Sequence, residues 1–385
     1  MSQPLLSTLA QNSRDVRLDI IRGFAIFTIT LNHYTFFAYA IGDLGGPSIR
    51  TLTQYGFSSA AELFFMLSGY LIGQIYLPIE KKLDLVDFSK RIWRRSLQLY
   101  IYNAILFITA GIICIFASPE IAKTSGYSHI HANGLYAFLQ FFTFSGHPLY
   151  LGILQYYSFF LLLSPLFVFA LQRSFGVSLM LIIAPYVLVQ FIPDINLPGG
   201  TFLRNQVWNF NPFAWQALFY GAILAGRFRL LNKLDMLIKK HRSIFYILIG
   251  LLIISVAYKV LEKHSPFNTF TLFGVDKTTV GITRVIHSLL VLTTLLTVLT
   301  KWPSLQNVFP SKLLSVVGKF SLQTFCASIV VNYLGVAIWF EYRSYSMYLL
   351  IGFISIVVVA FTALVLQGKK ASAGPTQKLK SKFVR

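Results

Sequence analysis

Apolar stretches long enough to cross a lipid bilayer as helices occupy most of this 385-residue chain. A spanning helix needs about 20 mostly apolar residues, and about ten stretches approach that length. They lie at 18–40, 58–78, 96–117, 149–171, 177–193, 210–226, 243–260, 281–300, 313–337 and 346–366. Charged residues make up only 12% of the chain, so a soluble fold could not cover this much apolar surface. The sequence therefore predicts an all-α polytopic membrane protein. It excludes a soluble enzyme, a disordered protein and a disulfide-stapled secreted domain.

The distribution of basic residues predicts the orientation of the chain. With the N-terminus inside, the segments on that side hold about three times as many Lys and Arg as the outer segments, which is the bias of cytoplasmic loops. Both termini are then expected in the cytoplasm. The net charge of +20 needs no nucleic acid, because these groups face anionic lipid headgroups. We expect a cytoplasmic N-terminal segment at 1–17, a membrane domain at 18–366 and a basic, disordered cytoplasmic tail at 367–385.

Ionisable residues inside membrane spans are costly, and several occur here. Arg22 and His33 are 11 residues apart, so a helix places them on one face with a rise of about 16.5 Å between them. Alone, Arg22 could be an interfacial anchor and His33 a helix-packing residue. Glu62 in the second stretch lies at a depth close to that of His33. We expect Glu62 to pair with His33, to fix its tautomer and to stabilise its charged form.

Other polar residues form two predicted layers across the membrane. The outer layer is a shared cavity to which the sixth and eighth stretches contribute Asn211, Gln216, Arg284 and His287. The inner layer lies near the cytoplasm, with Arg22 joined by Arg91, Arg94, Arg95, Lys319 and Ser321. Guanidinium groups match phosphate oxygens, which favours a phosphate site over simple positive-inside anchoring. An acyl-CoA would fit, with its phosphates on the arginines and its thioester near His33 as general base.

A metal site is not expected. His129, His131 and His147 lie in the longest outer loop, but their spacing is unspecific and no carboxylate or cysteine lies close behind them.

Seven ordered blocks resemble the OpgC family of the acyltransferase family 3 membrane enzymes. They are Arg17–Gly23, Ala60–Tyr70, Arg94-Arg95, Tyr156 with Ser164-Pro165-Leu166, Asn211–Gln216, Arg284–His287 and Gly318–Leu322. The resemblance implies bacterial inner-membrane enzymes that add succinyl groups to osmoregulated periplasmic glucans, and a wider superfamily that acylates extracytoplasmic sugars. It also implies His33 as the catalytic base and Arg22 as its essential companion. The chain departs from the family pattern at Phe320 and at Leu151–Leu154, which leaves the acyl group and the acceptor open.

The predicted site residues fall into three groups. The catalytic group is His33, Arg22 and Glu62. The group that would bind the acyl-CoA donor, either succinyl-CoA or acetyl-CoA, is Arg91, Arg94, Arg95, Lys319 and Ser68. The remaining substrate-binding group is Asp19, Asn211, Gln216, Arg284, His287 and Ser321.

These residues predict a multi-pass O-acyltransferase of the inner membrane. It would move a succinyl or acetyl group from a cytoplasmic acyl-CoA to hydroxyls of a periplasmic glucan or another extracytoplasmic polysaccharide. The alternative is a transporter or flippase of a glycan or an anionic small molecule, with the buried charges lining its path. A non-enzymatic scaffold gains nothing from buried His and Glu. The sequence leaves open the oligomeric state and which cation, Arg284 or Lys319, would bind a succinyl carboxylate.

Overall fold

The computed structural model describes residues 14–79, 84–202, 207–241, 243–264 and 274–372 of the chain. Within these ranges the protein is helical, and its only β-type pairs are two isolated bridges, His147 with Thr201 and Pro198 with Val207. The predicted all-α fold class is therefore confirmed. Most of the predicted N-terminal segment and of the predicted basic tail, 1–13 and 373–385, lies outside the described residues.

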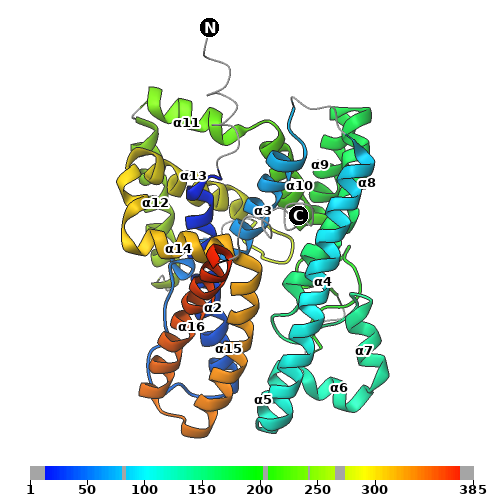
Figure 1. Cartoon of the computed structure of the whole chain (residues 1–385), viewed down its shortest axis with the longest axis vertical. Coiled ribbons are helices and arrows are strands. Elements are labelled where there is room, and N and C mark those ends of the chain that lie inside the picture. The colour runs from blue at the N-terminus through cyan, green and yellow to red at the C-terminus, as the bar shows by residue number, and fades with distance from the viewer. Residues whose placement is uncertain (1–13, 80–83, 203–206, 242, 265–273, 373–385) are drawn as a thin grey trace.

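The helices are named in chain order in Figure 1. Their bounds are α2 Val16–Ile41, η1 Leu52–Tyr55, α3 Ala60–Tyr76, α4 Leu85–Phe116, α5 Pro119–Ser125, α6 Tyr127–Asn133, α7 Leu135–Phe142, α8 Gly152–Arg173, α9 Phe175–Phe191, α10 Pro212–Arg227, α11 Leu230–Lys240, α12 Ser243–His264, α13 Ile282–Lys301, η2 Pro303–Asn307, α14 Phe309–Lys319, α15 Ser321–Tyr342 and α16 Tyr345–Ser372.

Every predicted apolar stretch contains a helix. Among the described residues, seven helices are long and apolar enough to cross a membrane: α2, α4, α8, α12, α13, α15 and α16. Helices α3, α9 and α10 are shorter, with 17, 17 and 16 residues. The chain is thus a multi-pass membrane protein, whereas the count of ten spans and the side of the termini stay predictions.

The ninth stretch, 313–337, is not the single helix that its hydropathy predicts. Helix α14 ends at Lys319 and α15 begins at Ser321, with Phe320 between them. The Thr324 hydroxyl lies 3.0 Å from the Phe320 carbonyl and 3.2 Å from the Val317 carbonyl, and it compensates hydrogen bonds that the break removes. On the other side of the break, a Cβ on Gly318 would lie 1.9 Å from the Asp19 carbonyl oxygen. The break therefore lets α14 press directly on the backbone of α2.

The helices run between two ends of different character (Figure 1). The start of α2 and the amphipathic helix α11, which carries Lys233, Lys239 and Lys240, lie at one end, called the basic end below. Helices α5 to α7 and the turn between α15 and α16 lie at the opposite end. In the upper half of the molecule α3 packs on α10, and a Cβ on Gly69 would lie 2.2 Å from the Phe219 carbonyl oxygen. Small residues thus allow the close helix contact that membrane interiors favour.

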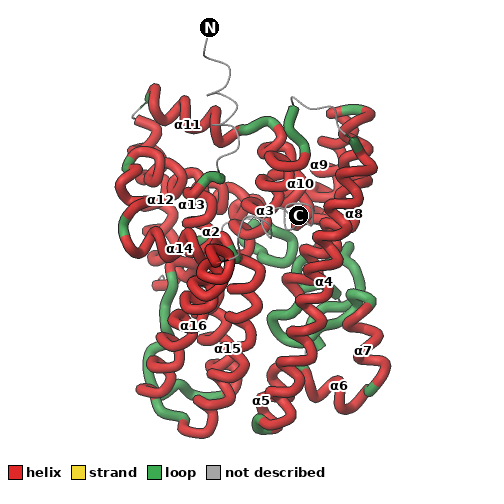
Figure 2. The backbone as a smooth tube through the Cα atoms, in the orientation of Figure 1, coloured by secondary structure: helices red, strands yellow, loops and turns green. Residues whose placement is uncertain are grey.

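Non-helical segments are not confined to the two ends. Figure 2 shows loops that cross the middle of the molecule beside α4 and α10. Parts of three such connections, around 147–150, at 201 and 209–210, and at 277–278, meet the second half of α2. Irregular backbone at this depth is tolerated where it is buried in protein or lines a cavity.

Candidate active site

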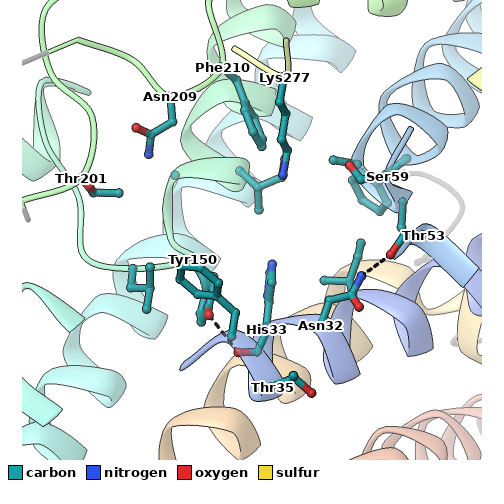
Figure 3. A pocket seen from close by; sticks show the side chains of 18 of the residues that line it. Asn32, His33, Thr35, Thr53, Ser59, Tyr150, Thr201, Asn209, Phe210 and Lys277 are labelled. Atoms are coloured by element: carbon teal, nitrogen blue, oxygen red, sulfur yellow. Dashed lines mark hydrogen bonds between the residues drawn. The ribbon is translucent and has the colours of Figure 1, made fainter. Parts of the chain in front are cut away.

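A cavity of about 730 Å³ lies where these loops meet α2 and the start of α3 (Figure 3). Its mouth includes Tyr39, which is 71% exposed, so the cavity reaches the surface near the end of α2 that is remote from the basic end. Its inner wall is apolar and consists of Ile29, Phe64 and Phe325, called the floor below. The rings of Phe64 and Phe325 have centroids 6.3 Å apart.

His33 projects from α2 into this cavity, as predicted for a reactive residue. Its ring stacks on Tyr150, with centroids 3.9 Å apart and planes 12° apart. The Tyr150 hydroxyl donates a 2.8 Å hydrogen bond to the His33 carbonyl, and Tyr150 has a left-handed backbone (φ 69°) that is unusual for its residue type. The buried Nδ1 of His33 has no hydrogen-bond partner among the described residues, which leaves Nε2 to face the cavity. A tyrosine ring, and no carboxylate, therefore orients this imidazole.

The predicted pairing of Glu62 with His33 is wrong. Glu62 is fully buried, and its Oε1 accepts hydrogen bonds from Nε of Arg284, at 2.8 Å, and from Nη2 of the same side chain. Its Oε2 accepts from the backbone N–H of Ser59 at 3.0 Å and from the Ser59 hydroxyl at 2.6 Å, which caps the first turn of α3. A shared depth in the membrane does not fix the direction in which a side chain points. A buried carboxylate is satisfied better by a permanent cation than by an imidazole.

Arg284 and His287 hold the segment before α3 in place. Arg284 binds Glu62, and Nδ1 of His287 accepts a 3.2 Å hydrogen bond from the backbone N–H of Ser58 and lies 2.7 Å from its hydroxyl. Neither side chain lines the cavity, although Ser59 does. Both residues therefore support the cavity wall from behind.

Asn211 and Gln216 also bind backbone groups outside the cavity. Asn211 caps α10 by accepting from the backbone N–H of Phe213 at 3.0 Å, and it donates to the Ile195 carbonyl at 2.6 Å. Gln216 donates to the Ile182 carbonyl of α9 at 2.9 Å. A cavity is present, but none of the four residues predicted to share one, Asn211, Gln216, Arg284 and His287, lines it.

Lys277 lines the cavity and was missed by the sequence reasoning, which counted it only as an outer-loop charge. Figure 3 shows its side chain pointing down toward the His33 ring. Its Nζ lies 5.3 Å from the centroid of the Phe210 ring. The buried Trp215 fixes this loop by donating to the Lys277 carbonyl at 3.1 Å. Burial lowers the pKa of Lys277, while the negative charge of Glu62 acts in the opposite direction.

His147 is a second histidine of the cavity wall, and it too was not predicted as a site residue. It is 3% exposed, with Nε2 at 2.9 Å from the Tyr156 hydroxyl and Nδ1 at 2.8 Å from the Pro148 carbonyl. Burial lowers the pKa of His147 to about 4. Of the other loop histidines, His129 pairs with Gln140. The described residues contain no His, Cys, Asp or Glu cluster able to hold a metal ion.

Arg22 lies beyond the cavity floor, toward the basic end. Its Nη2 donates to the Ser68 hydroxyl at 3.2 Å, and its buried Nε has no partner among the described residues. Ser68 is one helical turn past Phe64 on α3, so the floor separates Arg22 from His33. The predicted shared face of α2 is present, but the two side chains do not line one cavity.

The predicted arginine cluster of α4 is divided. Arg95 is half-buried, donates to Gln98 at 2.6 Å and is close enough to Arg22 to repel it. Arg94 is exposed, and Arg91 forms an exposed ion pair with Asp87 at 2.9 Å. The structure thus brings Arg95 to Arg22 and Ser68, and leaves Arg91 and Arg94 on the surface.

Asp19, Lys319 and Ser321 lie near the basic end as well. Asp19 is buried and ion-paired with Arg14, which also donates to the Lys319 carbonyl at 3.4 Å. A small cavity of about 200 Å³ is lined by Arg14, Asp19 and Lys319, among others. Ser321 is the buried first residue of α15. None of the three predicted residues lines the cavity that contains His33.

Fold and site together define a polytopic helical membrane protein with a histidine, His33, lining a cavity that reaches the surface. The family profile described as OpgC protein matches residues 14–371. The chain therefore belongs to the OpgC family, as its motifs predicted. No curated protein and no solved structure matches the chain.

Proposed function

We propose that this protein is an inner-membrane O-acyltransferase. It moves a succinyl or acetyl group from a cytoplasmic acyl-CoA to a hydroxyl of a periplasmic glucan or another extracytoplasmic polysaccharide. Membership of the OpgC family supports a glucan-modifying acyltransferase in general. The observation that carries the proposal for this chain is His33, with one ring nitrogen facing a cavity of about 730 Å³.

The proposed step is a direct acyl transfer. Nε2 of His33 takes the proton of the acceptor hydroxyl while the hydroxyl oxygen attacks the thioester carbonyl carbon. The carbon–sulfur bond then breaks, the new ester remains on the sugar, and the CoA sulfur leaves with the proton from His33. No carboxylate lines the described part of this cavity, so the imidazole would act with Tyr150 as its support.

The two sides of the cavity suit the two substrates. The cavity, whose mouth includes Tyr39, carries polar side chains such as Asn32, Thr53 and Asn209, which suit sugar hydroxyls (Figure 3). On the other side of the floor, Arg22 and Arg95 present guanidinium groups suited to CoA phosphates. The pantetheine arm would then have to pass between Phe64 and Phe325, so the floor must open during turnover.

The test is acyl transfer by the purified protein in lipid nanodiscs. Succinyl-CoA or acetyl-CoA is supplied with a glucan oligosaccharide, and free thiol and the mass of the oligosaccharide are measured. We expect one thiol released for each acyl group gained by the sugar. Uptake of the oligosaccharide into proteoliposomes without thiol release would overturn this proposal in favour of a transporter.

A further inference from the structure

The charge of Lys277 has no counter-ion on the cavity wall. Among the described residues that line the cavity there is no Asp or Glu, and Lys277 is the one Lys or Arg. A buried charge of this kind is costly unless it is paired. Its Nζ lies over the face of Phe210, 5.3 Å from the ring centroid, which is a weak partner compared with a carboxylate.

The neighbouring carboxylates are already engaged. Glu62 is held by Arg284 and Ser59. Asp276, next to Lys277 in the chain, accepts hydrogen bonds from the backbone N–H and the hydroxyl of Thr279 at 2.7 and 2.8 Å. Neither of these two carboxylates is ion-paired with Lys277 in the described structure. The cavity therefore presents the Lys277 amine, free of a protein carboxylate, to whatever binds there, and an anionic group beside it would favour its charged form.

The other cations considered for such a role are placed elsewhere. Arg284 is ion-paired with Glu62, to whose Oε1 both its Nε and its Nη2 donate, and Lys319 lies beside Arg14 in the smaller cavity near the basic end. Lys277 alone shares a cavity with His33 in the described structure, and it faces the ring (Figure 3).

We propose that Lys277 binds the free carboxylate at the far end of a dicarboxylic acyl group. It thereby selects such a group, succinyl being the four-carbon case, over acyl groups that end in a methyl. The inference rests on the proposed acyl transfer, because the reacting carbonyl must lie at His33 for the far carboxylate to reach across the cavity. The loop is preorganised for this task by Trp215 and by the Asp276–Thr279 contacts.

The experiment compares two donors of equal chain length. Succinyl-CoA and butyryl-CoA are offered to the wild type and to K277Q and K277R, with K123Q on the exposed surface of α5 as the matched control. We expect the wild type and K123Q to favour succinyl-CoA in kcat/KM by about 10- to 100-fold, the value of a charge-assisted contact. In K277Q, kcat/KM should fall for succinyl-CoA and stay unchanged for butyryl-CoA, so that the preference is lost. K277R should keep most of the preference.

Two results would overturn the inference. An equal fall for both donors in K277Q would show that Lys277 acts on the carbonyl common to both, and an unchanged ratio would show that it contacts neither. If the wild type releases thiol from no donor, the proposed acyl transfer itself fails. In that case free succinate, compared with butyrate, must still raise the unfolding temperature of the wild type and not that of K277Q, or the carboxylate site is refuted as well.

Discussion

The basic end and the cavity hold their positive charges in different ways. At the basic end, Arg14 is ion-paired with Asp19, and Arg17 is paired with both Asp15 and Asp235 at 2.6 Å. In the cavity, Lys277 faces His33 with no carboxylate among the described lining residues.

This difference separates anchoring from function. At the basic end the arginines are neutralised by carboxylates of the protein itself. Through Asp235 and Thr300, Arg17 also fixes α2 to α11 and to the end of α13. In the cavity, neither Lys277 nor His33 is bonded to a carboxylate among the described lining residues. Both groups can therefore contact a substrate. Arg22 and Arg95 are intermediate, since they lie near the basic end but repel each other.

The largest effect is expected at His33. If it were absent, the functional role assigned to the cavity, in contrast to the basic end, would be wrong. Replacing His33 with Ala should lower the rate of acyl transfer by about 10²- to 10⁴-fold, the usual contribution of a general base. Thiol release in nanodiscs measures the rate, and the unfolding temperature reports whether the fold is kept. His131→Ala, in the exposed part of α6, is the matched control and should be fully active. Wild-type activity of His33→Ala would remove this residue from the mechanism.

The next effect concerns stability and the cavity wall. Glu62→Ala should cost about 3–5 kcal/mol of unfolding free energy, because it leaves the Arg284 guanidinium buried and unpaired. The side chains of this pair are 0% and 11% exposed. Those of the Arg91–Asp87 pair are 49% and 55% exposed, so Asp87→Ala should cost less than about 1 kcal/mol. Denaturant unfolding in detergent measures both. Equal losses in the two variants would contradict the assignment of Glu62 to structure.

The dependence of stability on pH sharpens the description of the cavity wall. Because burial lowers the pKa of His147 from 6.5 to about 4, the folded protein keeps this ring neutral where the unfolded chain protonates it. The stabilisation is complete above pH 6.5 and is lost as the pH falls toward 4, by about 3 kcal/mol in total. His147→Gln should flatten this part of the curve of unfolding free energy against pH. A slope equal to that of the wild type would show that His147 is not the group responsible.

The smallest effect is expected at Arg95, which lies with Arg22 between the cavity floor and the basic end. Arg95→Ala should raise the KM for the acyl-CoA about tenfold with kcat nearly unchanged, because a phosphate contact remote from the reacting carbon contributes mainly to binding. Arg94→Ala, one residue away but exposed, should change KM by less than about twofold. A fall in kcat for Arg95→Ala, with KM constant, would place Arg95 in the chemical step.

Features that depend on the residue pattern along a single helix could be predicted from the sequence. The apolar stretches and the shared face of Arg22 and His33 follow from hydropathy and helical periodicity. The partner of Glu62 did not follow, because depth in the membrane says nothing about rotation around a helix axis. Lys277 could not be found at all, since a loop residue enters the cavity only through contacts such as that of Trp215, which lies far away in the sequence. The break after Lys319 was missed because hydropathy continues smoothly across it.

The floor formed by Ile29, Phe64 and Phe325 also bears on how a membrane stays energised. A continuous file of water from one face to the other would conduct ions and discharge the electrochemical gradient, and narrow apolar constrictions prevent this by expelling water. The cavity that holds His33 can therefore fill with water from its mouth while this apolar wall keeps the water from the side of Arg22. In a membrane that holds an ion gradient, leakage through such a protein would be limited to the moments when a bound substrate holds Phe64 and Phe325 apart.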